Sequence, residues 1–204
     1  LQVEHPVTEA ITGFDLVEWQ FRIAAGERLP VTNQTEIPLR GHAVEARLYA
    51  EDPERGFLPS TGPLVALSFP DADGLRVDSG VEQGGEISPY YDPMIAKLIA
   101  HADTREAALD RLRAALDSTI VAGPRTNLAF LSALCRSPDF RNGDFDTGYI
   151  ARHHGELGLD AQGIDAPAAA SGAAHLIAGA RAETAVPDAP VSPWDIADGF
   201  QLSG

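Results

Sequence analysis

GHAVEARLYA, at residues 41–50, is the stretch that decides the fold of this chain. Its side chains alternate in character with a period of two, which predicts a β-strand. One face of that strand is expected to carry His42, Val44, Ala46, Leu48 and Ala50. The opposite face is expected to carry Glu45, Arg47 and Tyr49. We therefore predict a strand that has one largely apolar face and one charged face.

Further strands are predicted downstream of this stretch. The candidates are residues 64–69, 75–77 and 94–100, separated by turns that are rich in glycine and proline. No helical pattern intervenes between them, and strands that follow one another in this way pair most readily as an antiparallel sheet. The middle of the chain is therefore predicted to form such a sheet.

Helices are predicted on both sides of the strands. Residues 7–25 have a helical pattern that Gly13 interrupts, and Asp15 is positioned to cap the second part. After the strands, Asp103 or Thr104 can cap a helix that runs to about Ser118. Shorter helices are expected at 127–134, from about residue 146, and at 168–182, where the pattern is weak. The fold class is predicted to be α+β.

Composition limits the function classes. The chain has 204 residues, with 15 basic and 30 acidic side chains, and a formal net charge of −15. Such an excess of acid disfavours nonspecific binding to nucleic acid or to an anionic membrane. No apolar run is long enough to cross a bilayer. A single cysteine, Cys135, excludes an internal disulfide and a cysteine-rich zinc site, and we expect it to be a small core residue.

The choice of basic residues indicates the kind of genome that encodes the chain. Lys97 is the only lysine, and alanine is abundant, which is a bias typical of GC-rich bacterial genomes. The chain starts at Leu1, without a charged-then-apolar signal segment. We therefore expect a piece of a longer polypeptide from the bacterial cytoplasm.

The opening segment QVEHPVTE, at residues 2–9, places an amide, a carboxylate and an imidazole close to a predicted strand-to-helix turn. Pro6 is expected to hold His5 out of helical geometry. The Glu4 carboxylate is suited to three roles: general base, cation ligand, or a stabilising charge at a helix N-terminus. Spacing alone leaves all three open.

Two further segments carry charged groups. Glu45 and Arg47 form either an ordinary surface pair or an arginine held by an acid so that it faces an anion. Asp92 follows two tyrosines, and it either closes a cleft or starts a turn before Pro93. Lys97 lies among apolar residues and is expected to be partly buried and ion-paired. The sequence contains no glycine-rich phosphate loop of the Walker type.

Taken together and in this order, these segments resemble biotin carboxylase. The matching stretches are QVEHPVTE at 2–9, RIAAG at 22–26, RGHAVEAR at 40–47, AEDP at 50–53 with FLPS at 57–60, and YYDPMIAK at 90–97. The resemblance implies the end of an ATP-grasp fold at 1–37 and the biotin carboxylase C-terminal domain, an antiparallel sheet with flanking helices, at 38–158. Residues 159–204 are then expected to be a linker and the start of a bridging domain.

The resemblance also implies roles for individual residues. Glu4 matches the glutamate that takes the proton from bicarbonate, and Arg47 matches the arginine that stabilises the biotin enolate and faces carboxyphosphate. Gln2 and the backbone of Val3 match groups that bind bicarbonate. We expect Glu45 or Asp92 to orient Arg47, and we expect no metal ligand in this chain.

Cofactors and partners follow from the same resemblance. ATP, Mg²⁺ and biotin are expected to need upstream or downstream domains, so the chain alone is expected to be inactive. A biotinyl carrier domain and a carboxyltransferase beta subunit are the expected partners, in an acyl-CoA carboxylase of the 3-methylcrotonyl-CoA type or else the propionyl- or acetyl-CoA type. The alternatives are a non-catalytic module for scaffold or subunit contacts, and another ATP-grasp ligase.

Overall fold

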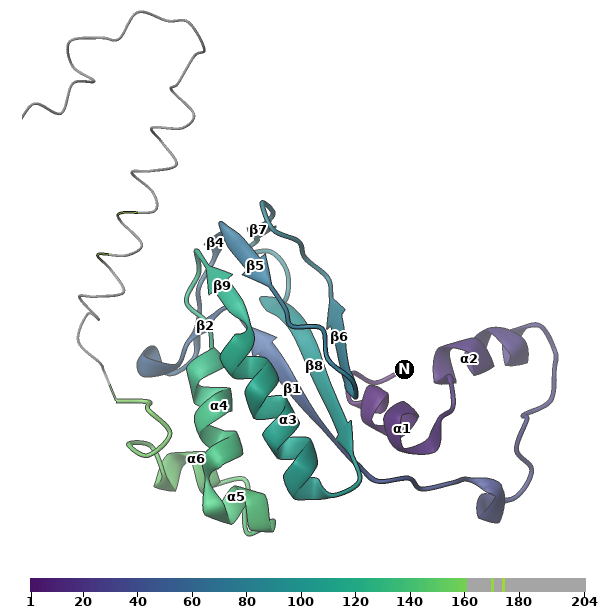
Figure 1. Ribbon diagram of the computed structural model, residues 1–204. Coiled ribbons are helices and arrows are strands. Elements are labelled where there is room, and N and C mark those ends of the chain that lie inside the picture. Colours follow the sequence, from purple (N-terminus) through teal and green to yellow (C-terminus); the bar gives the residue numbers. More distant parts are fainter. Residues whose placement is uncertain (161–169, 171–173, 175–204) are drawn as a thin grey trace, which may run out of the picture. The chain divides into compact units, whose positions relative to one another are not determined.

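The computed structural model describes residues 1–160, 170 and 174, and its centre is a three-stranded antiparallel sheet (Figure 1). The strand order is β1-β8-β6, with bounds His42–Tyr49, Met94–Ala102 and Leu75–Ser79. Both neighbouring pairs are antiparallel, as the sequence predicts. The third predicted region, 159–204, lies almost entirely outside the described residues, as does nearly all of the weak helix predicted at 168–182.

One face of the sheet forms the core, and the alternation in β1 sets which face this is. Ala46 and Leu48 of β1 and Leu98 of β8 are buried on it. Helix α3 (Arg105–Ser118) packs against this face through its apolar stripe, which includes Leu112. Thr104 rather than Asp103 caps α3, because its hydroxyl accepts a hydrogen bond from the Ala107 amide.

The remaining helices of this side follow α3 in the sequence. They are α4 (Leu128–Arg136), α5 (Pro138–Asn142) and α6 (Tyr149–Arg152). Helix α4 packs on α3, and a second apolar cluster joins Phe130 of α4 to Tyr149 of α6. The helices predicted at 127–134 and from about 146 are therefore present, whereas α5 was not predicted.

Helix α1 (His5–Thr12) contacts β1 and β8 and lies on the charged side of the sheet, where Glu4 meets Arg47. Gly13 ends it in a left-handed conformation with φ of 75°, as the predicted interruption requires. The prediction that His5 is non-helical is wrong. Pro6 occupies the first turn of the helix, where its missing N–H is not needed, so α1 begins at His5.

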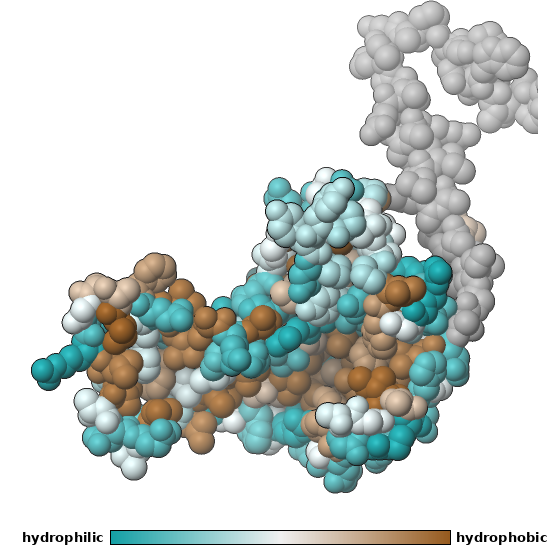
Figure 2. Space-filling model, turned by 180° about the vertical axis from the view of Figure 1, so that it is seen from behind, coloured by the Kyte–Doolittle hydropathy of each residue, from teal (hydrophilic) through white to brown (hydrophobic). Residues whose placement is uncertain are grey.

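Helix α2 (Leu16–Ala24) starts at the predicted cap, since the Asp15 carboxylate accepts a hydrogen bond from the Glu18 amide. None of its residues is fully buried. Its exposed apolar side chains include Val17, Phe21 and Ile23, and Figure 2 shows the hydrophobic surface that gathers around this part of the molecule. Among the described residues no helix has the length and apolar character that crossing a membrane would require.

Short elements complete the fold. Three two-stranded ladders pair β2 (Glu51–Asp52) with β3 (Leu58–Pro59), β4 (Gly62–Pro63) with β7 (Glu86–Ile87), and β5 (Ala66–Ser68) with β9 (Ile120–Ala122). The two 3₁₀ turns are Gln34–Glu36 and Pro53–Arg55. The strand predicted at 64–69 is thus shorter than expected and pairs with β9, which was not predicted. Gly123 permits this crossing, because a Cβ there would lie 2.0 Å from the Pro63 carbonyl oxygen.

Candidate functional site

Glu4 and Arg47 come from distant parts of the sequence and meet at the charged face of the sheet. Oε2 of Glu4 lies 3.4 Å from Nη2 of Arg47, across a sequence separation of 43 residues. Glu4 directly precedes α1 but its side chain makes no capping hydrogen bond, so the carboxylate is free to face β1. Side-chain exposure is 58% for Glu4 and 41% for Arg47. Both charges are therefore accessible to a small anion.

Glu45 contacts Arg47 on the same strand. The two residues share the charged face of β1, and Oε1 of Glu45 lies 3.4 Å from Nε of Arg47. The Glu45 side chain is only 6% exposed, and its Oε2 atom has no hydrogen-bond partner among the described residues. Burial raises the pKa of Glu45, although the hydrogen bond from Arg47 and the charge of Lys97 oppose that shift. Of the two predicted orienting residues, Glu45 is the one that contacts Arg47.

Asp92 lies in the turn that leads into β8, and its Oδ1 atom accepts a hydrogen bond from the Met94 amide at 3.0 Å. This is the turn-forming geometry that one of the two sequence interpretations expects. The pKa of Tyr49 is raised, first by burial of its side chain and second by the negative charge of Asp92. Tyr90 and Tyr91, which precede it, are largely exposed.

Gln2 and Val3 lie next to Glu4 in the exposed turn before α1. The Gln2 carbonyl accepts a hydrogen bond from the His5 amide at 3.3 Å, which helps to fix this turn. The structure thus brings Glu4 to Arg47 at the N-terminal end of α1, with Gln2 and Val3 in the turn just before it, whereas Asp92 is held by its own turn.

Sequence reasoning missed Asn127, which holds the end of β1 at the level of Arg47. Its Oδ1 accepts a hydrogen bond from the Tyr49 amide at 2.9 Å, and its Nδ2 donates one to the Arg47 carbonyl at 3.1 Å. Asn127 also occupies the N-cap position of α4, yet its side chain makes no capping hydrogen bond there. An asparagine just before a helix predicts a cap, so the pattern alone hides the contact with β1.

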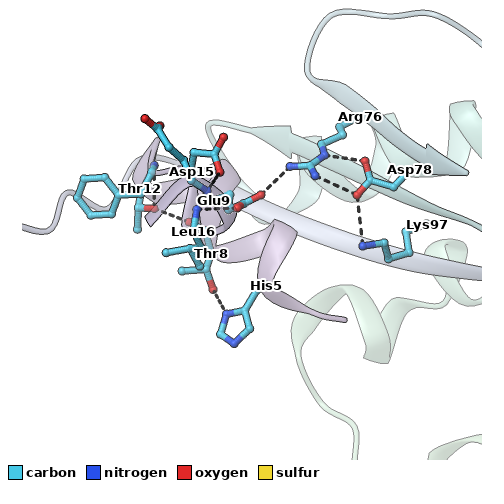
Figure 3. A network of polar contacts seen from close by, with 11 residues as sticks. His5, Thr8, Glu9, Thr12, Asp15, Leu16, Arg76, Asp78 and Lys97 are labelled. Atoms are coloured by element: carbon cyan, nitrogen blue, oxygen red, sulfur yellow. Dashed lines mark hydrogen bonds and ion pairs between the residues drawn. The ribbon is translucent and has the colours of Figure 1, made fainter. Parts of the chain in front are cut away.

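A network of charged side chains links Lys97 of β8 to Asp78 and Arg76 of β6 and to Glu9 of α1 (Figure 3). Lys97 is paired in register with Arg47 on one side and with Asp78 on the other. Nζ of Lys97 lies 3.2 Å from Oδ2 of Asp78, and the lysine side chain is 19% exposed, which confirms the predicted partly buried ion pair. Arg76 and Glu9 extend the network towards α1.

The described residues contain no cluster of three or more His, Cys, Asp or Glu side chains that is suited to a metal ion. The arrangement at Glu4 and Arg47 places a guanidinium beside a carboxylate, and the guanidinium is suited to an anion.

Comparison with known proteins identifies the family. Residues 45–152 match the family model described as the biotin carboxylase C-terminal domain, and residues 1–32 match that of the carbamoyl-phosphate synthase L chain, ATP binding domain. The mitochondrial methylcrotonoyl-CoA carboxylase subunit alpha of Mus musculus is 56% identical over 158 residues, covering 77% of this chain. The propionyl-CoA carboxylase alpha chain of Ruegeria pomeroyi is 48% identical over 202 residues, covering 87% of this chain and 30% of its own.

Solved structures agree with the sequence relatives. The biotin carboxylase domain of a thermophilic 2-oxoglutarate carboxylase bound to bicarbonate superposes with a TM-score of 0.75 at 46% identity, covering 77% of this chain and 35% of that one. This chain spans only 22% of the length of the mouse relative. Sequence, fold and residue pattern agree, and the chain belongs to the biotin carboxylase family, of which it carries the C-terminal domain and the end of an ATP-grasp fold.

Proposed function

We propose that this chain forms one wall of a site that carboxylates biotin with bicarbonate and ATP, in which Glu4 is the general base and Arg47 stabilises developing negative charge. The single observation that supports this most is the 3.4 Å contact between the Glu4 carboxylate and the Arg47 guanidinium. A relative of the same fold is described as bound to bicarbonate, which fits an anion at this place.

The chemistry follows from the charges. A carboxylate beside a bound anion acts as a base only if a cation offsets the repulsion, and a planar guanidinium offers parallel N–H donors to an oxyanion. Arg47 is preorganised by Glu45, so little reorganisation is needed when charge develops on the biotin ureido oxygen. The Gln2 side-chain amide and the Val3 backbone N–H supply additional donors for bicarbonate.

Other parts of the enzyme complete the site in this proposal. ATP and Mg²⁺ are held by other domains of the polypeptide, and ATP supplies the phosphoryl group that activates bicarbonate. A biotinyl carrier domain brings biotin to Arg47, and a carboxyltransferase beta subunit uses the product. The chain by itself is then inactive.

The acyl-CoA substrate and the setting are proposed from the relatives. The mouse and Dictyostelium discoideum relatives are methylcrotonoyl-CoA carboxylase subunits, so 3-methylcrotonyl-CoA is favoured over propionyl-CoA and acetyl-CoA. Relatives include both mitochondrial and bacterial proteins, and we propose the bacterial cytoplasm for this one. Residues 1–37, 38–158 and 159–204 remain our proposed division into ATP-grasp end, C-terminal domain, and linker with bridging domain.

The test measures biotin-dependent ATP hydrolysis and carboxylation in the full-length carboxylase. Glu4→Gln and Arg47→Ala are each expected to lower kcat by at least a hundredfold, in line with the loss of one preorganised charge. Glu18→Gln and Arg22→Ala are matched controls, because this pair on α2 is similarly exposed and lies outside the site. Activity within threefold of the parent enzyme in either site variant would refute the assignment and favour the scaffold alternative.

A further inference from the structure

Glu9 is a nearly buried carboxylate on α1 that uses both of its oxygens. Its side chain is 11% exposed. Oε2 accepts a hydrogen bond from Nη1 of Arg76 at 2.7 Å, and Oε1 accepts one from the Leu16 amide at 2.9 Å. Figure 3 shows both contacts. Glu9 therefore ties α1 to strand β6 and, at the same time, to the first residue of α2.

Arg76 connects Glu9 to the sheet through hydrogen bonds to Asp78. Its Nε and Nη2 atoms donate to the two oxygens of Asp78 at 2.8 and 3.0 Å, and Asp78 in turn pairs with Lys97, the register partner of Arg47. Hydrogen bonds to Asp78 and Glu9 raise the pKa of Arg76. Burial of Asp78 is outweighed by its bonds from Arg76 and Lys97, so the pKa of Asp78 is lowered. The Arg76–Asp78 pair is therefore ionised at neutral pH.

Packing alone does not fix α1 on the sheet. Only Pro6 and Thr12 of this eight-residue helix are fully buried. A cavity of about 430 Å³ opens beside it, and its lining includes Pro6, Glu9, Ala10, Phe14, Arg76 and Ile99. Because this hollow is open to solvent, α1 has no packing partner on that side to resist its displacement. The 2.7 and 2.9 Å bonds of Glu9 therefore restrain α1 on this side, in addition to the hydrogen bond that the Ile11 carbonyl accepts from the Arg40 amide at 2.8 Å.

We propose that Glu9 is a positioning residue, which holds α1 through Arg76 so that Glu4 at the start of the helix stays in contact range of Arg47. This inference rests on the proposed function of Glu4 and Arg47. Glu9 itself is placed away from the reacting groups and acts through the helix that it holds.

Steady-state kinetics of the full-length carboxylase provide the first test. Glu9→Ala and Arg76→Ala are each expected to lower kcat at least tenfold while the KM for ATP stays within twofold. The double variant is expected to be no more than threefold worse than either single one, because both remove the same contact. Glu9→Gln keeps an acceptor for the Leu16 amide and should recover part of kcat. The exposed Glu18–Arg22 pair supplies the control, with Glu18→Ala expected within twofold of the parent enzyme.

Amide hydrogen exchange of the 204-residue chain provides a readout that does not depend on activity. In Glu9→Ala, amides of α1 should exchange at least tenfold faster while those of β8 remain unchanged. If the amides of β8 also exchange faster in Glu9→Ala, the same measurement on Glu9→Gln distinguishes local from global unfolding. In this variant only the amides of α1 are expected to exchange faster.

Unchanged exchange in α1, or an unchanged kcat, would overturn the inference. The two proposals fail separately. If Glu4→Gln and Arg47→Ala keep their activity, the proposed function is wrong. If they lose it and Glu9→Ala does not, only the positioning role is wrong.

Discussion

Replacing Asn127 with alanine is expected to lower the free energy of unfolding by about 2–4 kcal/mol. The change removes two hydrogen bonds and leaves the Tyr49 N–H and the Arg47 carbonyl without their partner. Asn127 is 5% exposed, so water reaches this place poorly. Each unsatisfied group costs about 1–3 kcal/mol when it is buried. Because Tyr49 and Arg47 are only half-buried, we use the lower part of this range for each.

Thermal and urea unfolding of the 204-residue chain, followed by circular dichroism, measure this loss. A decrease of 2–4 kcal/mol corresponds to a fall in Tm of about 4–16 °C for a domain of this size. Asn127→Asp keeps the acceptor for the Tyr49 amide but turns a carboxylate oxygen towards the Arg47 carbonyl in a buried place, so its loss should be at least as large as that of the alanine variant. Asn33→Ala, at an exposed asparagine, should change stability by less than about 0.5 kcal/mol. A loss below about 1 kcal/mol in Asn127→Ala would refute the reasoning.

Three more predictions concern the sheet and its surroundings. The pKa of Glu45 is raised by burial, so its contribution to stability is complete below its unfolded-state value of about 4.3 and is lost as pH rises through the folded-state value. The free energy of unfolding of the parent relative to Glu45→Gln should therefore fall between pH 4 and 8 in urea titrations, and a flat difference would contradict this. Leu112→Ala should cost about 2–5 kcal/mol by the same method, since Leu112 is buried in the main core, and a cost under 1 kcal/mol would show that the site collapses freely. Gly123→Ala should lower Tm by several degrees, because φ is +125° and the new Cβ would meet the Pro63 carbonyl; an unchanged Tm would argue against this close approach.

Local patterns in the sequence predict the fold well where one signal dominates. Alternation in β1 predicted its core face, and Gly13 with Asp15 predicted the break between α1 and α2. Local patterns fail where a distant contact overrides them. Strand β9 forms because it pairs with β5. It has only three residues, which are too few for an alternating pattern to be recognised in the sequence.

The residues of the candidate site also divide into those that the sequence predicts and those that only the structure shows. Resemblance singled out Glu4 and Arg47, and the structure brings them together. No spacing rule relates Glu9 to Arg76, which are 67 residues apart, or Asn127 to the end of β1. Such contacts depend on how α1 and α4 dock on the sheet, and docking geometry is not encoded in any one segment.

Cys135, the only cysteine, has a practical consequence for experiments on this chain. It lies 4% exposed in the core, and burial raises the pKa of its thiol to about 11. At neutral pH the native thiol is therefore both shielded and protonated, so maleimides and methanethiosulfonates should leave it untouched. Pairs of introduced surface cysteines can then carry spin labels or fluorophores in an otherwise unaltered background, and the distance between α2 and the sheet becomes directly measurable in solution.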